Sequence, residues 1–375
     1  MRLYYNHSAS QNHKRSAMLL FTPGPTEMEQ DIRDIAAMRL PYFRGQEYTK
    51  MMLELTENLK YLFRTENTPL TLTASGSGVM EMALLNLLNP GDRVVVLNCG
   101  TFGGKWTTMC RSFGVVPHEI KPELGEIPDL EKLSDAITGE VRAVLVTAHE
   151  TSTGLLNDIK AIGEITRSRG VLLIVDAVSS IGADLFAMDD WHCDCALVSS
   201  QKALACMPGL SFIAFSERAW QVVPSVKRHR YYFDAEEYMQ NIRRGMVPYT
   251  PAMNVTFQVH ERLARIRRSG LTAYIDGHVA KAKAFRERML QSGDFSLFAQ
   301  RQSNALTSLL LPEGCTMSEV IAFIRDKYDW YVAPNPTQDQ RYLRVSHMGA
   351  ITIENLLELA EKIEEACRSF RKGRK

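Results

Sequence analysis

Apolar residues in the middle of the chain alternate between short continuous runs and runs with helical spacing. Arg93–Leu97, Val141–Thr147 and Val171–Val175 are strand-length and rich in β-branched residues, whereas Gly78–Leu88 and Ile159–Arg169 carry their apolar residues at helical spacing. Apolar strands that alternate with helices are typical of a mostly parallel sheet covered by helices on both faces. We therefore expect an α/β fold with a three-layer α/β/α large domain.

The pattern changes after about residue 250. Helical periodicity runs through Phe257–Leu290, and the helical segments Met317–Tyr328 and Ile353–Phe370 interleave with the strand-like segments Ala305–Leu311 and Tyr342–Val345. This mixture predicts a smaller α+β domain at the C-terminal end.

Chain length also favours two domains, because 375 residues exceed what a single hydrophobic core usually spans. We predict a polar N-terminal tail over 1–17, a large domain over 18–255 and a small domain over 256–375. The N-terminal segment of the large domain is expected to contact the small domain as well.

Composition excludes several classes of partner. The 44 Lys and Arg residues nearly balance the 43 Asp and Glu residues, so bulk charge makes no case for nucleic acid or an anionic membrane. The longest apolar runs are too short to span a membrane, and the first residues lack a secretory signal pattern. Seven scattered cysteines suggest no disulfide framework, so we expect a cytoplasmic protein.

Three features at predicted strand ends could take part in binding or catalysis. The Ala74–Gly78 loop precedes a helix, where free N–H groups suit an anion, although it could equally be a turn with a serine cap. Asp176 ends an apolar strand, and Lys202 follows the next one; singly, they could be a helix cap and a surface charge. Together they supply what pyridoxal phosphate chemistry requires, namely a phosphate cradle, an acid for the ring nitrogen and an imine-forming lysine.

The chain resembles the class V, fold-type I pyridoxal-phosphate aminotransferases, specifically the alanine/serine–glyoxylate (or pyruvate) branch. The resemblance covers roughly residues 19–370 and depends on the order and spacing of nine motifs. These motifs are Phe21–Thr26, Ser75–Gly78, Asn98–Gly103, His149–Gly154, Val175–Ala177, Ser200–Leu204, Pro208–Leu210, Tyr249–Ala252 and Leu343–Gly349.

The resemblance implies pyridoxal 5'-phosphate as cofactor and assigns roles around its ring. Lys202 matches the Schiff-base lysine, which also moves the substrate proton as the catalytic acid and base. Asp176 matches the acid that keeps the ring nitrogen protonated, and Thr151 matches the residue that hydrogen-bonds the ring hydroxyl. Phe102 lies at the ring-stacking position, where some members have a larger tryptophan.

The resemblance also implies how the phosphate is held. Three consecutive residues at the start of the helix would bind it, namely Ser77, Gly78 and Val79, and Gln201 would add a donor. Val79 departs from members that have a polar side chain there. Tyr249 and Thr250 match a segment that reaches the phosphate of the neighbouring subunit, which implies a homodimer with shared active sites.

Substrate contacts follow from two further matches. Arg344 matches the arginine that takes the substrate carboxylate, and Gly24 belongs to a turn that lines the substrate side. The expected reaction moves an amino group from alanine or serine to glyoxylate or pyruvate by a ping-pong mechanism. No metal is expected, since the His192–Cys195 cluster has no second ligand pair at zinc spacing.

Other functions within this fold stay open. A 2-aminoethylphosphonate–pyruvate aminotransferase shares the Glu150–Asn157 motif, whereas Gln201–Leu204 favours the glyoxylate branch. A non-catalytic subunit that binds pyridoxal phosphate is less compatible with a full set of competent residues. A cysteine-desulfurase-type lyase would need a mobile loop cysteine, and Cys315, the only candidate by position, follows an ordinary turn.

Overall fold

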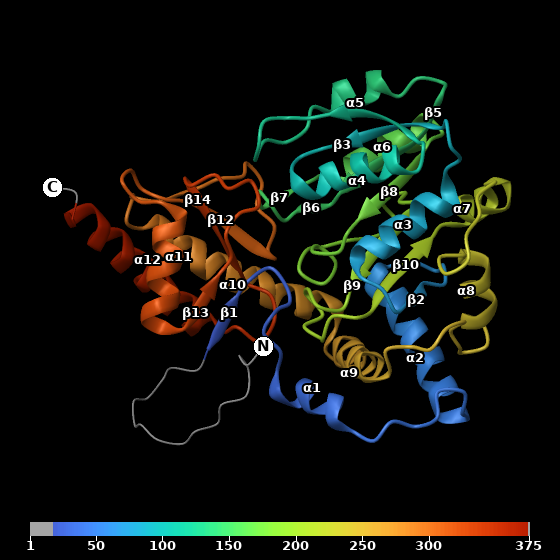
Figure 1. Ribbon diagram of the computed structural model, residues 1–375, viewed down its shortest axis with the longest axis horizontal. Helices are drawn as coiled ribbons and strands as arrows, with labels where there is room; N and C mark the ends of the chain where they lie inside the picture. The colour runs from blue at the N-terminus through green and yellow to red at the C-terminus, as the bar shows by residue number, and fades with distance from the viewer. Residues whose placement is uncertain (1–17, 374–375) are drawn as a thin grey trace.

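The computed structural model describes residues 18–373, and a seven-stranded sheet lies at its centre (Figure 1). The predicted tail over 1–17 lies outside the described residues. In spatial order the strands are β2 (Leu70–Leu72), β10 (Ser211–Phe215), β9 (Cys195–Ser199), β8 (Leu172–Asp176), β5 (Val141–Thr147), β3 (Arg93–Leu97) and β4 (Val116–Ile120). Only β10 runs antiparallel to its neighbours in this sheet, so the prediction of a mostly parallel sheet is confirmed.

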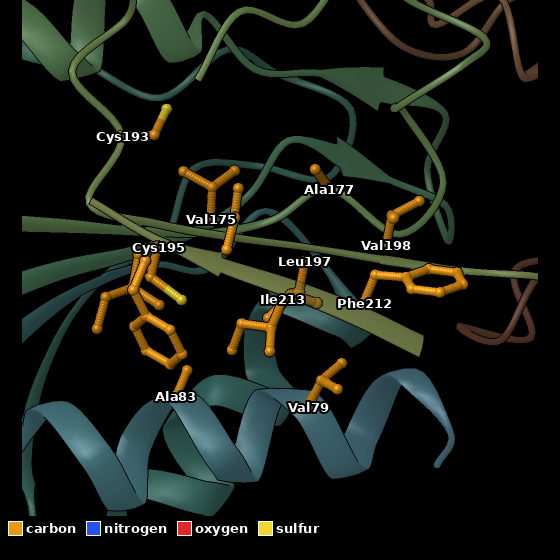
Figure 2. Close-up of a cluster of buried hydrophobic side chains, with 14 of the residues drawn as sticks. Val79, Ala83, Val175, Ala177, Cys193, Cys195, Leu197, Val198, Phe212 and Ile213 are labelled. Atoms are coloured by element: carbon orange, nitrogen blue, oxygen red, sulfur yellow. The ribbon is translucent and has the colours of Figure 1, made fainter. Parts of the chain in front are cut away.

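Helices cover the sheet, and all of its strands except the edge strand β4 are buried along nearly their whole length. The helices of this unit are α1 (Gln30–Asp34), α2 (Gln46–Phe63), α3 (Gly76–Leu87), α4 (Thr101–Ser112), α5 (Leu130–Ala136), α6 (Ile159–Ser168), α7 (Glu217–Val222), α8 (Ala235–Ile242) and α9 (Met253–Ser269). Figure 2 shows Val79 and Ala83 on the side of α3 that faces Leu197 and Ile213 of the sheet. All four side chains are fully buried, so α3 is held by apolar packing and its first turn is fixed at the sheet edge.

A second apolar core lies in the C-terminal unit. It contains an antiparallel sheet, β11 (Ser296–Leu297), β12 (Leu306–Leu310) and β14 (Tyr342–Ser346), with the helices α10 (Leu271–Leu290), α11 (Met317–Tyr328) and α12 (Ile353–Gly373). The N-terminal strand β1 (Leu19–Phe21) pairs in parallel with β13 (Trp330–Val332) of this unit. Phe21 is fully buried in this core, and its ring centroid lies 5.2 Å from that of Trp330. The strand near the N-terminal end of the described residues therefore contacts the C-terminal unit.

The predicted continuous helical run over Phe257–Leu290 is wrong in one respect. It is divided into α9 and α10 by Gly270, whose φ of +93° is incompatible with a right-handed helix. Buried residues of α9 such as Val259 and Leu263 belong to the larger core, and α9 packs against α2. The domain boundary at 255/256 stays a prediction.

Candidate active site

Two of the predicted residues lie at the same edge of the large sheet. Asp176 is the last residue of β8 and pairs with Thr147 of β5 on one side and Leu197 of β9 on the other. Lys202 lies in the turn that follows β9. The carboxyl ends of parallel strands meet at one edge, so the turn after β9 brings Lys202 to Asp176. Desolvation lowers the pKa of the lysine, and the Asp176 carboxylate offsets part of that decrease.

The Lys202 amine is packed against the N-terminal segment. Its Nζ donates a 2.6 Å hydrogen bond to the carbonyl oxygen of Pro23, and Thr26 Oγ1 donates to the Lys202 carbonyl at 3.1 Å. Desolvation lowers the pKa of Lys202 to about 8 despite the nearby Asp176. A Cβ on Gly24 would lie 2.8 Å from Nζ, so the turn at this position leaves no space for a side chain. The amine is therefore oriented and partly neutral near physiological pH.

Asp176 is a buried acid. The side chain belongs to a residue that is 5% exposed, and its Oδ1 accepts a 3.0 Å hydrogen bond from the Val178 amide. Burial raises the pKa of Asp176 to about 6, and the positive charges of Lys105 and Lys202 counteract that rise. A carboxylate in this environment is stabilised by a cationic ligand.

The first turn of α3 offers unpaired amides to an anion. The amides of Gly78 and Val79 donate to the Ser75 carbonyl at 2.9 and 3.3 Å, whereas those of Gly76 and Ser77 have no acceptor within the part of the chain that the structure describes. The Val79 side chain points into the core. The first-turn amides and the Ser77 hydroxyl are thus the local groups for an anion, and the phosphate-binding roles of Ser77, Gly78 and Val79 stay predictions.

Phe102 is positioned by an acid to which the sequence analysis assigned no role. The amides of Phe102 and Gly103, in the first turn of α4, donate to the two carboxylate oxygens of Glu150 at 3.2 and 2.8 Å. Ser152 Oγ accepts from the Thr101 amide at 3.0 Å and donates to Glu150. An acid at a helix N-terminus is favourable, so Glu150 fixes the direction in which Phe102 leaves the helix. The sequence signal that could have indicated Glu150 was an acid three residues after the buried strand β5.

Arg344 comes from β14 of the C-terminal unit and reaches this edge. It is 6% exposed; its Nη1 donates to the Thr151 carbonyl at 2.8 Å and its Nε donates to the Pro334 carbonyl at 3.1 Å. Burial lowers the pKa of Arg344 to about 10, and within the described residues no carboxylate lies at ion-pair distance from it. The Thr151 hydroxyl forms a 2.7 Å hydrogen bond with the Ser179 hydroxyl. A buried guanidinium with spare donors suits a carboxylate ligand.

Within residues 18–373 of one chain, the side chains of three predicted cofactor residues form no hydrogen bond with Lys202, Asp176 or Arg344; these residues are Tyr249, Thr250 and Gln201. The Tyr249 hydroxyl donates to the Tyr231 carbonyl at 2.7 Å, its ring stacks on that of Tyr232, and Thr250 is exposed. Gln201 is next to Lys202, but the contact found there is through its backbone carbonyl, which accepts from the amide of Thr26.

The residues present fit pyridoxal phosphate. The buried acid Asp176 could pair with the ring nitrogen, and Lys202, whose pKa is lowered, could bond to the carbonyl carbon. The unpaired amides at the start of α3 could bind the phosphate. Across residues 18–373, no group of three or more His, Cys, Asp or Glu side chains could hold a metal ion. Among those residues there is also no helix with the length and apolar character needed to cross a membrane.

Comparison with known proteins places the chain in a family. A family model described as aminotransferase class-V matches residues 35–326. The soluble hydrogenase 42 kDa subunit of Anabaena cylindrica is 31% identical, covering 92% of either chain, and a serine–glyoxylate aminotransferase of Methylorubrum extorquens is 30% identical over 90% of this chain and 88% of its own. The solved alanine–glyoxylate aminotransferase of Nostoc sp. has a TM-score of 0.89 at 25% identity, covering 96% of this chain and 97% of its own.

These similarities extend over nearly the whole chain and agree with the geometry of the site. The fold is that of fold-type I aminotransferases, and the chain is a transaminase that acts on amino acids and oxo acids. The cofactor of this family is pyridoxal phosphate. The chain belongs to the class-V aminotransferase family.

Proposed function

We propose that this enzyme transfers an amino group from alanine or serine to glyoxylate or pyruvate. The observation that carries the proposal is the Arg344 guanidinium, which is buried, has no carboxylate partner among residues 18–373 and is close enough to lower the pKa of Lys202. A substrate carboxylate bound there would bring its α-carbon to the lysine. The Methylorubrum and Nostoc relatives are glyoxylate aminotransferases, which supports glyoxylate as an acceptor here.

Each residue of the site has a defined task. Bound pyridoxal phosphate supplies an electron-withdrawing ring that acidifies the α-hydrogen of the donor. The Asp176 carboxylate would hold a proton on the ring nitrogen, and Phe102 would pack on the ring face. Lys202 Nζ, once free, would take the α-proton and return it one position away, a task for which its pKa of about 8 is well matched.

Substrate orientation depends on the two chain segments that meet at the lysine. Arg344 would bind the carboxylate through the donors that the Thr151 and Pro334 carbonyls leave free. Gly24 keeps the N-terminal turn against the Lys202 side chain, so this turn excludes water from one side of the amine.

A matrix of donors and acceptors tests the reaction. Alanine, serine and 2-aminoethylphosphonate would each be combined with glyoxylate and with pyruvate, and product formation would be followed for the cofactor-loaded enzyme. We expect turnover with alanine or serine and parallel lines in initial-rate plots. Turnover confined to 2-aminoethylphosphonate and pyruvate would identify the phosphonate enzyme instead, and bound cofactor without any turnover would identify a non-catalytic subunit.

We also propose a homodimer in which Tyr249 and Thr250 serve the partner's site. Support comes from their position, because within one chain Thr250 is exposed and the Tyr249 ring packs on a surface tyrosine. Co-expression of Lys202→Ala chains with Tyr249→Phe/Thr250→Ala chains tests this. A shared site predicts that mixed dimers regain one intact site and up to half the activity, whereas residues that serve their own chain predict no recovery.

Cellular location and domain organisation complete the proposal. All seven cysteines are free and buried thiols, which supports a reducing, cytoplasmic location that fractionation of the source cells would test. Two separate apolar cores support two domains, and we propose the division into residues 18–255 and 256–375, with α9 packing on the larger core. Limited proteolysis near the boundary, with mass analysis of the fragments, would test that division.

A further inference from the structure

We propose that Lys105 is a cofactor-binding residue whose ammonium group neutralises the phosphate of pyridoxal phosphate. This inference rests on the proposed function and adds to it a residue that neither the sequence motifs nor the comparisons assign.

Lys105 is carried to the site by the same helix that carries Phe102. It follows Phe102 by three positions in α4, so both side chains leave the same face of the helix. The Lys105 Nζ lies 5.1 Å from the centroid of the Phe102 ring and donates a 3.1 Å hydrogen bond to Ser77 Oγ. This contact joins the N-terminal part of α4 to the first turn of α3.

The ammonium group has capacity that the protein does not use. Ser77 Oγ is the acceptor found for Nζ, whereas an ammonium has three donors. Among residues 18–373, no carboxylate lies within 4.0 Å of Nζ, so the charge has no direct ion-pair partner. Lys105 is thus half-buried, has no carboxylate beside it and is hydrogen-bonded to Ser77 of the proposed phosphate loop. A cation in this position is stabilised by an anion.

The local charge balance points to the phosphate as that anion. The amides of Gly76 and Ser77 contribute only partial positive charge, whereas a phosphate monoester carries close to two negative charges near neutral pH. Two other cations of the site have different tasks: Lys202 would bond covalently to the cofactor, and Arg344 donates hydrogen bonds to the Thr151 and Pro334 carbonyls. Among residues 18–373, Lys105 is therefore the cation that hydrogen-bonds to the proposed phosphate loop.

Lys105 also influences Asp176, whose pKa it lowers, so a second role must be separated from the first. If Lys105 acted mainly by keeping Asp176 ionised, its loss would weaken any ligand that contains the pyridine ring. If it binds the phosphate, its loss would weaken only ligands that carry one. Pyridoxal and pyridoxal phosphate differ in that group alone.

The test measures dissociation constants of the full-length apoprotein for pyridoxal phosphate and pyridoxal by quenching of tryptophan fluorescence. Lys105→Met should raise the dissociation constant for pyridoxal phosphate about 10- to 100-fold, the loss of one charge-assisted hydrogen bond, and leave that for pyridoxal within about twofold. Lys105→Arg should restore most of the affinity. Lys132→Met, on the exposed face of α5, is the matched control and should change neither constant.

The outcomes separate this inference from the proposed function. Unchanged affinity of Lys105→Met for pyridoxal phosphate, or equal weakening of both ligands, would overturn the phosphate role while leaving the enzyme a cofactor-dependent transaminase. A wild-type protein that binds neither ligand would overturn the proposed function, and this inference with it. Inorganic phosphate should compete with pyridoxal phosphate in the wild type and lose that effect in Lys105→Met.

Discussion

Arg344 Nη1 donates a 2.8 Å hydrogen bond to the backbone carbonyl of Thr151, although 193 positions separate the two residues. The bond joins β14 of the C-terminal unit to the loop that follows β6 (His149–Glu150) and lies beside the large sheet. Glu150, the last residue of β6, directly precedes that loop and fixes the start of α4 and thus Phe102. The guanidinium proposed to bind substrate therefore also holds the loop that positions the ring-stacking residue.

Replacing Arg344 should reveal both tasks. Arg344→Ala should lower kcat/KM for amino-acid donors by about 1.5 to 4 decades, because a buried charged contact is lost. It should also lower the free energy of unfolding by about 1–3 kcal/mol, since the Thr151 and Pro334 carbonyls lose their donor. Steady-state kinetics and urea titration measure the two effects. Arg344→Lys should recover only part of the activity, because a point charge cannot form the planar fork.

Arg341→Ala is the matched control for Arg344→Ala. Arg341 precedes the same strand but is exposed and pairs with Asp339, so we expect small changes in rate and stability. Normal donor kinetics in Arg344→Ala would contradict the carboxylate role. Normal rates with 2-aminoethylphosphonate alone would support the phosphonate alternative, since that donor has no α-carboxylate.

Gly24→Ala should disturb the lysine through steric overlap. The new Cβ would lie 2.7 Å from Lys202 Cδ, so the amine must move, and a displacement near 1 Å can cost about 100-fold in rate. Gly170→Ala is matched, because Gly170 also has positive φ but its Cβ would meet nothing within 4 Å. Equal losses of activity in the two variants would mean that backbone strain, rather than contact with Lys202, is responsible.

Cofactor attachment should follow the titration of Lys202. Desolvation places its pKa at about 8, so the reactive neutral amine increases about tenfold between pH 7 and 9 and then levels off. Stopped-flow absorbance of apoprotein mixed with pyridoxal phosphate would measure the attachment rate. A rate that still rises steeply above pH 9.5 would indicate a lysine with an ordinary pKa. Borohydride reduction and peptide mapping should find the cofactor on Lys202.

The same shift affects the stability of the apoprotein. The pKa of Lys202 is lower in the folded state than in the unfolded chain, so the folded state binds this proton more weakly. The resulting penalty is complete below about pH 8 and disappears as the pH rises towards 10.5. Lys202→Met should therefore raise the free energy of unfolding at pH 7, on the order of 1–3 kcal/mol, and lose that advantage above pH 10. Urea titrations at the two pH values measure this.

Asp176 should make cofactor binding dependent on pH. Its pKa is raised to about 6, so the carboxylate that would pair with the ring nitrogen is lost as the pH falls through that value. Affinity for pyridoxal phosphate should decrease about tenfold per unit below pH 6, and Asp176→Asn should remove this component. The difference between the two proteins is the informative quantity, because the phosphate also titrates near pH 6. Asp135→Asn, on exposed α5, should match the wild type, and identical pH profiles for wild type and Asp176→Asn would exclude the pairing.

Local sequence patterns were sufficient for most of the fold. Strands β3 and β5 begin and end where the apolar runs do, because a buried parallel strand needs apolar residues along its whole length. Strand ends also indicated where Asp176 and Lys202 would lie, since the carboxyl ends of parallel strands share an edge. The long helical pattern concealed the break at Gly270, because helical spacing resumes immediately after that residue.

By itself, the sequence determined the α/β class, the order of the elements and the residue types at the strand ends, because these depend on short-range periodicity. Tertiary structure decided which distant groups meet: Pro23 with Lys202, Thr151 with Arg344, and Lys105 with Ser77. These contacts join segments that local pattern does not relate. The lowered pKa of Lys202 and the raised pKa of Asp176 likewise arise from burial and neighbouring charge, which only the packed chain creates.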